Sequence, residues 1–206
     1  NLAETTEQLA SRLQDVAHLG SELHIDFVDG EFIHHQTVLP ADIEVGKVHP
    51  KLQAHLMVRH PELYFDRLIE QRFRTIIFHF ETTKSKTAEI AASLKVHHVR
   101  VGLAINPITD VREIKRYLNE VNLITVLSVE PGYLGHPMLP YTLAKVAELR
   151  AAHFRGTIQL DGGINQETIR EASQTGADEL IIGSAISRDD RPADAYHQLV
   201  KQLIKQ

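Results

Sequence analysis

Four residues that can bind a metal ion lie on or at the end of predicted strands. His24 and Asp26 are two residues apart on one strand, so both side chains point to the same face. His55 lies on the next predicted strand, and Asp161 ends a late strand just before a pair of glycines. Two imidazoles and two carboxylates suit a divalent ion and offset its charge. The alternative is that each polar group is buried and satisfied by backbone hydrogen bonds.

The elements that must position these residues form an alternating pattern. Short apolar runs predict strands at residues 23–28, 53–58, 75–79, 99–104, 123–128, 157–161 and 179–183. Amphipathic stretches predict helices at residues 6–18, 109–120, 143–153, 166–175 and 193–205, with Thr109 and Asn165 as predicted caps. Apolar strands separated by helices are typical of a parallel sheet covered by helices.

A (β/α)8 (TIM) barrel explains both the pattern and the site. In such a barrel the carboxyl ends of several strands converge at one mouth, where active sites lie. We therefore expect one barrel domain over residues 1–206. Only seven strands are predicted and a closed barrel needs eight. Either the first strand lies outside this sequence, or the barrel is completed in some other way.

Composition narrows the class of protein. The 206 residues carry a net charge of −5 and no block of Lys and Arg, which argues against nucleic-acid binding. No apolar run of about 18 residues is present, so no membrane span is expected. There is no cysteine, which excludes disulfides and thiolate metal sites. The first residues do not look like a signal peptide, and a cytoplasmic location is expected.

Seven motifs occur in an order that resembles the ribulose-phosphate 3-epimerase family, from about residue 23 to residue 187. They are Leu23-His24-Ile25-Asp26 with Asp29-Gly30 and Phe32; His55-Leu56-Met57-Val58 with Pro61; Phe78-His79 with Glu81; Gly102-Leu103-Ala104-Ile105-Asn106-Pro107; Ser128-Val129-Glu130-Pro131-Gly132; Asp161-Gly162-Gly163-Ile164; and Gly183-Ser184-Ala185-Ile186. Each motif alone is weak, but together they are specific.

The resemblance implies an isomerase of the pentose phosphate pathway that epimerises a ketose phosphate at C3, converting D-ribulose 5-phosphate to D-xylulose 5-phosphate. It implies one divalent metal ion (Zn, Fe, Mn or Co), held by His24, Asp26, His55 and Asp161. Asp26 and Asp161 would also be the catalytic acid/base pair, one on each face of a planar enediolate. A metal chelated by the substrate oxygens would stabilise the developing oxyanion. Glu81 and Glu130 are interpreted as structural residues or as supports of the site.

The resemblance also implies that the domain over residues 1–206 is a barrel of the ribulose-phosphate-binding type. It further implies a sugar-phosphate site and self-association into a homo-oligomer. Glycines let the backbone approach the phosphate closely, and the start of a nearby helix would favour the anion. The implied substrate-binding residues are His55, Met57, Gly132, Tyr133, Gly135, Gly162, Gly163, Gly183 and Ser184.

Departures from the family pattern leave alternatives open. The loop after the strand at 123–128 reads Pro131-Gly132-Tyr133-Leu134-Gly135-His136, where the family usually has a second glycine in place of Leu134. A hexulose 6-phosphate is therefore an alternative substrate, and a sugar-phosphate sensor with weak turnover is an alternative function. Decarboxylases that resemble orotidine phosphate decarboxylase need a lysine two residues after an aspartate, but Val28 stands two residues after Asp26.

Overall fold

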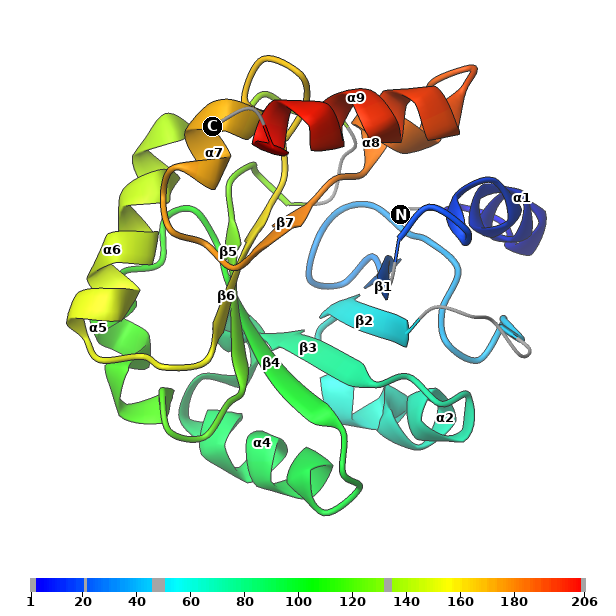
Figure 1. Ribbon diagram of the computed structural model, residues 1–206. Helices are drawn as coiled ribbons and strands as arrows, with labels where there is room; N and C mark the ends of the chain where they lie inside the picture. Colours follow the sequence, from blue (N-terminus) through cyan, green and yellow to red (C-terminus); the bar gives the residue numbers. More distant parts are fainter. Residues whose placement is uncertain (1–2, 21, 46–50, 132–134, 205–206) are drawn as a thin grey trace.

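Seven parallel strands form one sheet that curves into a nearly closed barrel (Figure 1). The computed structural model describes residues 3–20, 22–45, 51–131 and 135–204. The sheet order follows the chain from β1 to β7. The strands are β1 (Glu22–Val28), β2 (Lys51–Met57), β3 (Thr75–His79), β4 (Arg100–Ile105), β5 (Leu123–Leu127), β6 (Thr157–Asp161) and β7 (Glu179–Ile181).

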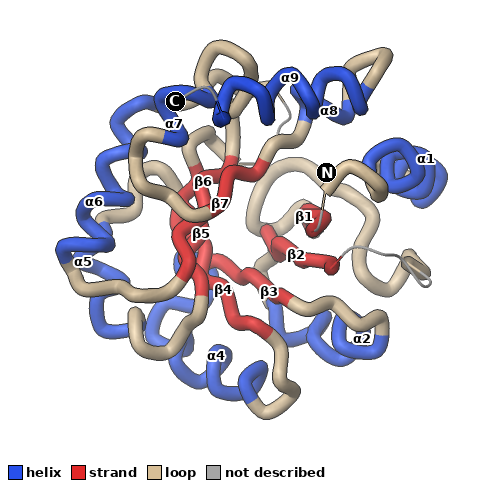
Figure 2. Tube along the Cα trace, in the orientation of Figure 1, coloured by secondary structure: helices blue, strands red, loops and turns tan. Residues whose placement is uncertain are grey.

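Helices form an outer layer around the strands, as Figures 1 and 2 show. This arrangement explains the apolar strands, since a parallel sheet covered by helices is buried on both faces. The α-helices are α1 (Thr6–Val16), α2 (Phe65–Glu70), α3 (Phe80–Thr83), α4 (Thr87–Lys95), α5 (Val111–Ile114), α6 (Ala144–Ala151), α7 (Ile169–Ser173), α8 (Ser184–Ser187) and α9 (Pro192–Ile204). Short 3-10 turns are η1 (Pro61–Tyr64), η2 (Lys84–Lys86), η3 (Lys115–Tyr117) and η4 (Pro140–Leu143).

The alternation of side chains along each strand separates two kinds of interior. Residues that face the helices, such as Ile76 and Phe78 on β3, belong to the main apolar core. Residues between them face the barrel axis, where Ile77 packs with Ala104 and Leu123. On β2 the same alternation points His55 toward the axis, so the barrel interior is the place where polar groups meet.

The predicted fold class is confirmed, and so are seven strands at the predicted places. Among the described residues, no backbone pairing joins β7 to β1, so these are the two edges of the sheet. Among the helices of the described residues, none is both long and apolar enough to cross a bilayer.

Two helix starts were predicted wrongly. Asp110, not Thr109, caps α5, because its carboxylate accepts the backbone N–H of Arg112 and Glu113 completes a capping box. Asn165 does not begin a long helix: its side chain accepts the N–H of Glu167 and Thr168 in a turn, and α7 starts only at Ile169. Both errors arise because several short polar residues compete to bond the same free backbone groups.

Candidate active site

The four predicted metal ligands meet at the carboxyl-terminal mouth of the barrel. His24 and Asp26 lie on β1, His55 on β2, and Asp161 is the last residue of β6. The parallel register places Asp26 directly beside His55. The chain between β2 and β6 forms three further strands around the barrel, and this closure brings Asp161 back to residues more than a hundred positions earlier.

Their ligand atoms are close enough for one ion. Nδ1 of His55 lies 3.0 Å from Oδ1 of Asp26 and 3.4 Å from Oδ2 of Asp161. Nε2 of His24 lies 3.5 Å and 3.7 Å from the same two oxygens. One ligand atom from each of His24, Asp26, His55 and Asp161 lies within 4.8 Å of all the others. Both imidazoles are buried and the carboxylates nearly so, which favours a bound ion over solvated charges.

The outer nitrogens of both imidazoles support this ligand set. Nδ1 of His24 lies 3.2 Å from the side-chain oxygen Oε1 of Gln53, and Nε2 of His55 lies 2.9 Å from Nε2 of His79. A metal-bound histidine usually donates its second N–H to such a partner, and this fixes which nitrogen faces the ion. The donor set and its surroundings therefore fit a divalent metal.

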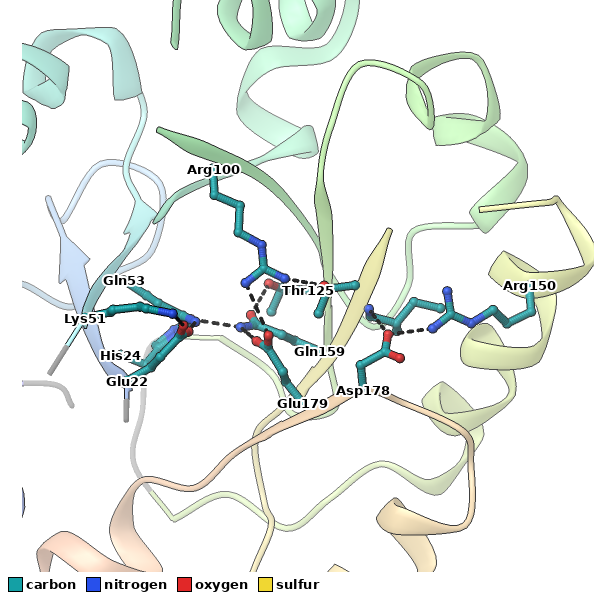
Figure 3. Close-up of polar contacts among 12 residues, drawn as sticks. Glu22, His24, Lys51, Gln53, Arg100, Thr125, Arg150, Gln159, Asp178 and Glu179 are labelled. Carbon is teal, nitrogen blue, oxygen red and sulfur yellow. Dashed lines mark hydrogen bonds and ion pairs between the residues drawn. The ribbon is translucent and has the colours of Figure 1, made fainter. Parts of the chain in front are cut away.

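A polar layer across the barrel interior holds Gln53 in place (Figure 3). Oε1 of Gln53 accepts a hydrogen bond from Nε2 of Gln159 at 2.8 Å, and Nε2 of Gln53 donates to Glu22. Gln159 in turn accepts from the hydroxyl of Thr125 at 2.8 Å. Because the amide nitrogen of Gln53 donates to Glu22, its oxygen is the atom that faces His24, and it has a second lone pair with which to accept the N–H of that imidazole.

The two carboxylates of the site favour a protonated His55. Burial alone would lower the pKa of His55, but hydrogen bonds to Asp161 and Asp26 and their charges raise that pKa to about 9. In the metal-free protein both ring nitrogens of His55 therefore carry a proton at neutral pH. A metal ion bound at one of these nitrogens would have to take the place of its proton, because only a deprotonated nitrogen can be a ligand.

The pKa values of His79 and Glu81, the pair behind His55, are both lowered, but for different reasons. Burial lowers the pKa of His79, although the neighbouring Glu81 carboxylate opposes the change. Burial would raise the pKa of Glu81, but the hydrogen bond and charge of His79 lower it, as do hydrogen bonds from Asn106 and Thr109, to about 2.

A pocket of about 240 Å³ opens onto the four ligand residues. It is bordered by the predicted substrate-binding residues that the structure describes, which are Met57, Gly135, Gly162, Gly163, Gly183 and Ser184, besides His55. The structure brings these residues together, and their contact with substrate stays a prediction. The other two predicted residues, Gly132 and Tyr133, lie outside the described residues, as does Leu134.

The glycine pair after Asp161 can hold no larger residue. Gly162 has φ +116° and Gly163 has φ +67°, a backbone region that disfavours other residues. A Cβ atom on Gly162 would overlap the side chain of Val129. The hydroxyl of Ser128 donates to the carbonyl oxygen of Gly162 at 2.7 Å, which fixes the turn beside the pocket.

Similarity to known proteins shows the family of this chain. The sequence model of the ribulose-phosphate 3 epimerase family matches residues 2–187. The chain belongs to this epimerase family. A ribulose-phosphate 3-epimerase, cytoplasmic isoform, from Oryza sativa subsp. japonica is 31% identical and covers 98% of this chain, which spans 91% of that relative. The ribulose-phosphate 3-epimerase of Bacillus subtilis is 30% identical, with 86% of this chain and 85% of the relative covered.

Solved structures outside the epimerase family share the fold. The 3-hexulose-6-phosphate synthase from Salmonella typhimurium superposes with a TM-score of 0.75 at 15% identity, covering 99% of this chain and 96% of the other. Orotidine 5'-phosphate decarboxylase from Pyrococcus horikoshii superposes with a TM-score of 0.66 at 12% identity, covering 98% and 96%. At such identities the likeness concerns the barrel and not its chemistry.

The sequence did not predict the partners of the two imidazoles. His79 stands in a recognised motif, yet no role was expected for it, and Gln53 was read only as part of a strand. Alternation gives a signal in hindsight: Gln53 and His55 are two apart on β2, as His24 and Asp26 are on β1, so all four face the barrel interior.

Proposed function

We propose that this epimerase-family chain catalyses metal-dependent epimerisation at C3 of a ketose phosphate, converting D-ribulose 5-phosphate to D-xylulose 5-phosphate. The single observation that carries the proposal is the convergence of two imidazoles and two carboxylates within 4.8 Å at the mouth of the barrel. The names of the rice and Bacillus subtilis relatives support the choice of substrate.

Asp26 and Asp161 are the proposed acid/base pair. Epimerisation beside a ketone removes a proton from one face of the carbon and returns one to the other face, so it needs two groups that reach the carbon from different sides. Asp26 comes from β1 and Asp161 from β6, and both border the pocket. In the proposed direction, Asp26 takes the C3 proton and Asp161 supplies the new one.

The remaining residues hold the ion and the substrate. His24, Asp26, His55 and Asp161 would bind one divalent ion, whose positive charge would stabilise the enediolate oxygens. The backbone amides around Gly162, Gly163, Gly183 and Ser184 would bind the phosphate. Met57, which packs with Val28, Phe32 and Ile33, would cover the reacting carbon with an apolar surface. Such a surface excludes water from the enediolate.

The proposed cellular setting rests on the name of a relative. A cytoplasmic location is supported by the rice relative, whose name is that of a cytoplasmic isoform. Sugar phosphates are the proposed partners, and assembly into a homo-oligomer is proposed from the family resemblance alone.

Metal content and turnover test the proposal together. Protein purified without chelator should hold about one metal ion per chain and should epimerise ribulose 5-phosphate. His55→Ala should lose both, whereas His97→Ala, which changes an exposed histidine, should lose neither. A hexulose 6-phosphate assayed in parallel covers the alternative substrate. Full metal occupancy without turnover of any pentulose or hexulose phosphate would leave the sensor as the better account.

A further inference from the structure

A line of hydrogen bonds runs from His55 away from the pocket and into the protein. Nε2 of His55 lies 2.9 Å from Nε2 of His79, and Nδ1 of His79 lies 3.0 Å from Oε2 of Glu81. The other carboxylate oxygen of Glu81 accepts the backbone N–H of Asn106 at 2.8 Å and the hydroxyl of Thr109. None of these groups other than His55 borders the pocket.

The two imidazoles are arranged for a directed bond and are shielded from water. Their ring planes differ by 13°, with centroids 5.1 Å apart, and both side chains are fully buried. The ring of Phe32 covers His79 at a centroid distance of 4.9 Å. The hydroxyls of Thr82 and Thr83 donate to the carbonyl oxygen of His79, at 3.2 Å and 3.0 Å, and hold its backbone at the end of β3.

The hydrogen bonds of Glu81, at the end of the line away from the pocket, fix which group donates and which accepts in every bond of the line. The backbone N–H of Asn106 can only donate, and a carboxylate can only accept. Glu81 therefore requires a proton on Nδ1 of His79, and in a neutral imidazole this leaves Nε2 of His79 as an acceptor. That acceptor requires a proton on Nε2 of His55. The nitrogen left for a metal ion is then Nδ1 of His55, which is the one that faces Asp26 and Asp161.

We propose that His79 and Glu81 are positioning residues that fix the tautomer of His55, so that Nδ1 of His55 faces the metal ion. The inference rests on the metal site of the proposed function and adds two residues to it. In an ordinary buried polar pair, the two side chains only satisfy each other's hydrogen-bonding groups. Here the pair also determines that Nδ1 of His55, an atom that neither side chain contacts, is the nitrogen that gives up its proton and binds the metal ion.

Replacing Glu81 with glutamine should exchange the donor and acceptor roles along the line of hydrogen bonds without changing the shape of the side chains. The N–H of Asn106 would hold the amide oxygen of the new side chain, so the amide NH2 would point at Nδ1 of His79. His79 would then carry its proton on Nε2, and His55 would have to accept there and carry its own proton on Nδ1. Zinc affinity should fall about 10- to 100-fold, the usual cost of losing an outer partner of a ligand.

The experiment uses zinc alone and two measurements on the folded protein. Nitrogen–proton correlation spectra of the zinc-loaded, 15N-labelled protein report which nitrogen of His79 is protonated. Titration against a competing chelator reports zinc affinity. Thr109→Val is the matched control, because it removes a hydrogen bond to the same oxygen of Glu81 but leaves the Asn106 bond and the direction unchanged. It should keep the Nδ1–H form of His79 and a zinc affinity within about threefold of wild type, since it removes no direct partner of a metal ligand.

A second pair of variants keeps the test decisive if Glu81→Gln fails to fold. In His79→Gln the amide oxygen can accept from His55 while the NH2 donates to Glu81, so the direction survives. In His79→Leu neither bond is possible. The expected order of zinc affinity is wild type, then His79→Gln, then His79→Leu.

Two outcomes would overturn the inference. One is an Nε2–H tautomer of His79 in the wild-type protein. The other is a Glu81→Gln protein with wild-type zinc affinity and an unchanged His79 tautomer. Both differ from failure of the proposed function, in which the wild-type protein itself binds no zinc under any loading condition.

Discussion

The backbone nitrogen of Met138 lies 2.5 Å from the point where a Cβ atom on Gly163 would stand. Gly163 also has φ +67°, so an alanine there would be strained as well as crowded. We predict that Gly163→Ala pushes the proposed phosphate loop away from Met138, raising KM for ribulose 5-phosphate about tenfold or more with the metal still bound. Steady-state kinetics on metal-loaded protein measures the change.

Gly176→Ala is the control that separates the effect of backbone strain from the effect of the overlap with Met138. Gly176 has φ +84°, but no atom lies within 4 Å of its Cβ position. This variant should lose about 1–2 kcal/mol of stability from strain and keep its KM. If both variants showed the same KM, the loop at Gly163 would not bind the phosphate.

Metal binding should depend on pH through His55. Its pKa in the metal-free protein is about 9, so below pH 9 a metal ion must displace a proton. Apparent zinc affinity should therefore rise about tenfold per pH unit between pH 6.5 and 8.5. Calorimetry in buffers of different ionisation enthalpy should show about one proton released per zinc bound at pH 7.5. Affinity that is independent of pH in this range would show that His55 is not a ligand.

Glu81 should stabilise the protein at neutral pH and cease to do so in acid. Its pKa is lowered from 4.5 to about 2 in the folded protein, so its contribution is present above pH 4.5 and is lost as the pH falls toward 2. The difference in unfolding free energy between wild type and Glu81→Gln should shrink by up to about 3 kcal/mol over this range. Denaturant unfolding at pH 7 and pH 3 measures it.

The exposed Glu120 supplies the comparison for this measurement. It pairs with Lys95 at the surface, at 3.0 Å, and such pairs contribute little. Glu120→Gln should change stability by less than about 1 kcal/mol at either pH. An equal pH response in both variants would argue that Glu81 is not held as a buried carboxylate.

Much of the fold was readable because burial imposes strong patterns. The strands at residues 75–79 and 157–161 were predicted to the residue, since each is a short apolar run between polar turns. The short helices α2, α3 and α4 were not predicted. Each has few turns in which a periodic pattern can develop, and their formation depends on packing against the sheet.

The site was only half readable for a different reason. His24 and Asp26 can be paired from one strand, because alternation fixes their common face. The contact between His55 and His79 cannot be predicted from one strand, because it depends on how far neighbouring strands are shifted along the barrel. In the structure His55 lies beside Ile77, and its ring reaches His79 two residues further along β3.

The two aspartates should differ in what they leave behind when they are changed to asparagine. Asp161→Asn should still let Asp26 remove and return the C3 proton on its own face, so slow hydrogen exchange should persist without epimerisation. Asp26→Asn should lose both hydrogen exchange and epimerisation in the forward direction. Acid–base steps contribute a factor of about 100 to 10,000, so both losses should be measurable. Metal content must be equal in the compared proteins, because both residues are also proposed ligands.

Deuterium incorporation tests the central claim most directly. Metal-loaded wild-type protein is incubated with D-ribulose 5-phosphate in heavy water, and the product is examined by NMR. An epimerase with an enediolate intermediate and two acid/base carboxylates should place deuterium at C3 of xylulose 5-phosphate and at no other carbon. Xylulose 5-phosphate without deuterium at C3, or fully metal-loaded protein that gives neither epimerisation nor exchange, would contradict the proposed mechanism.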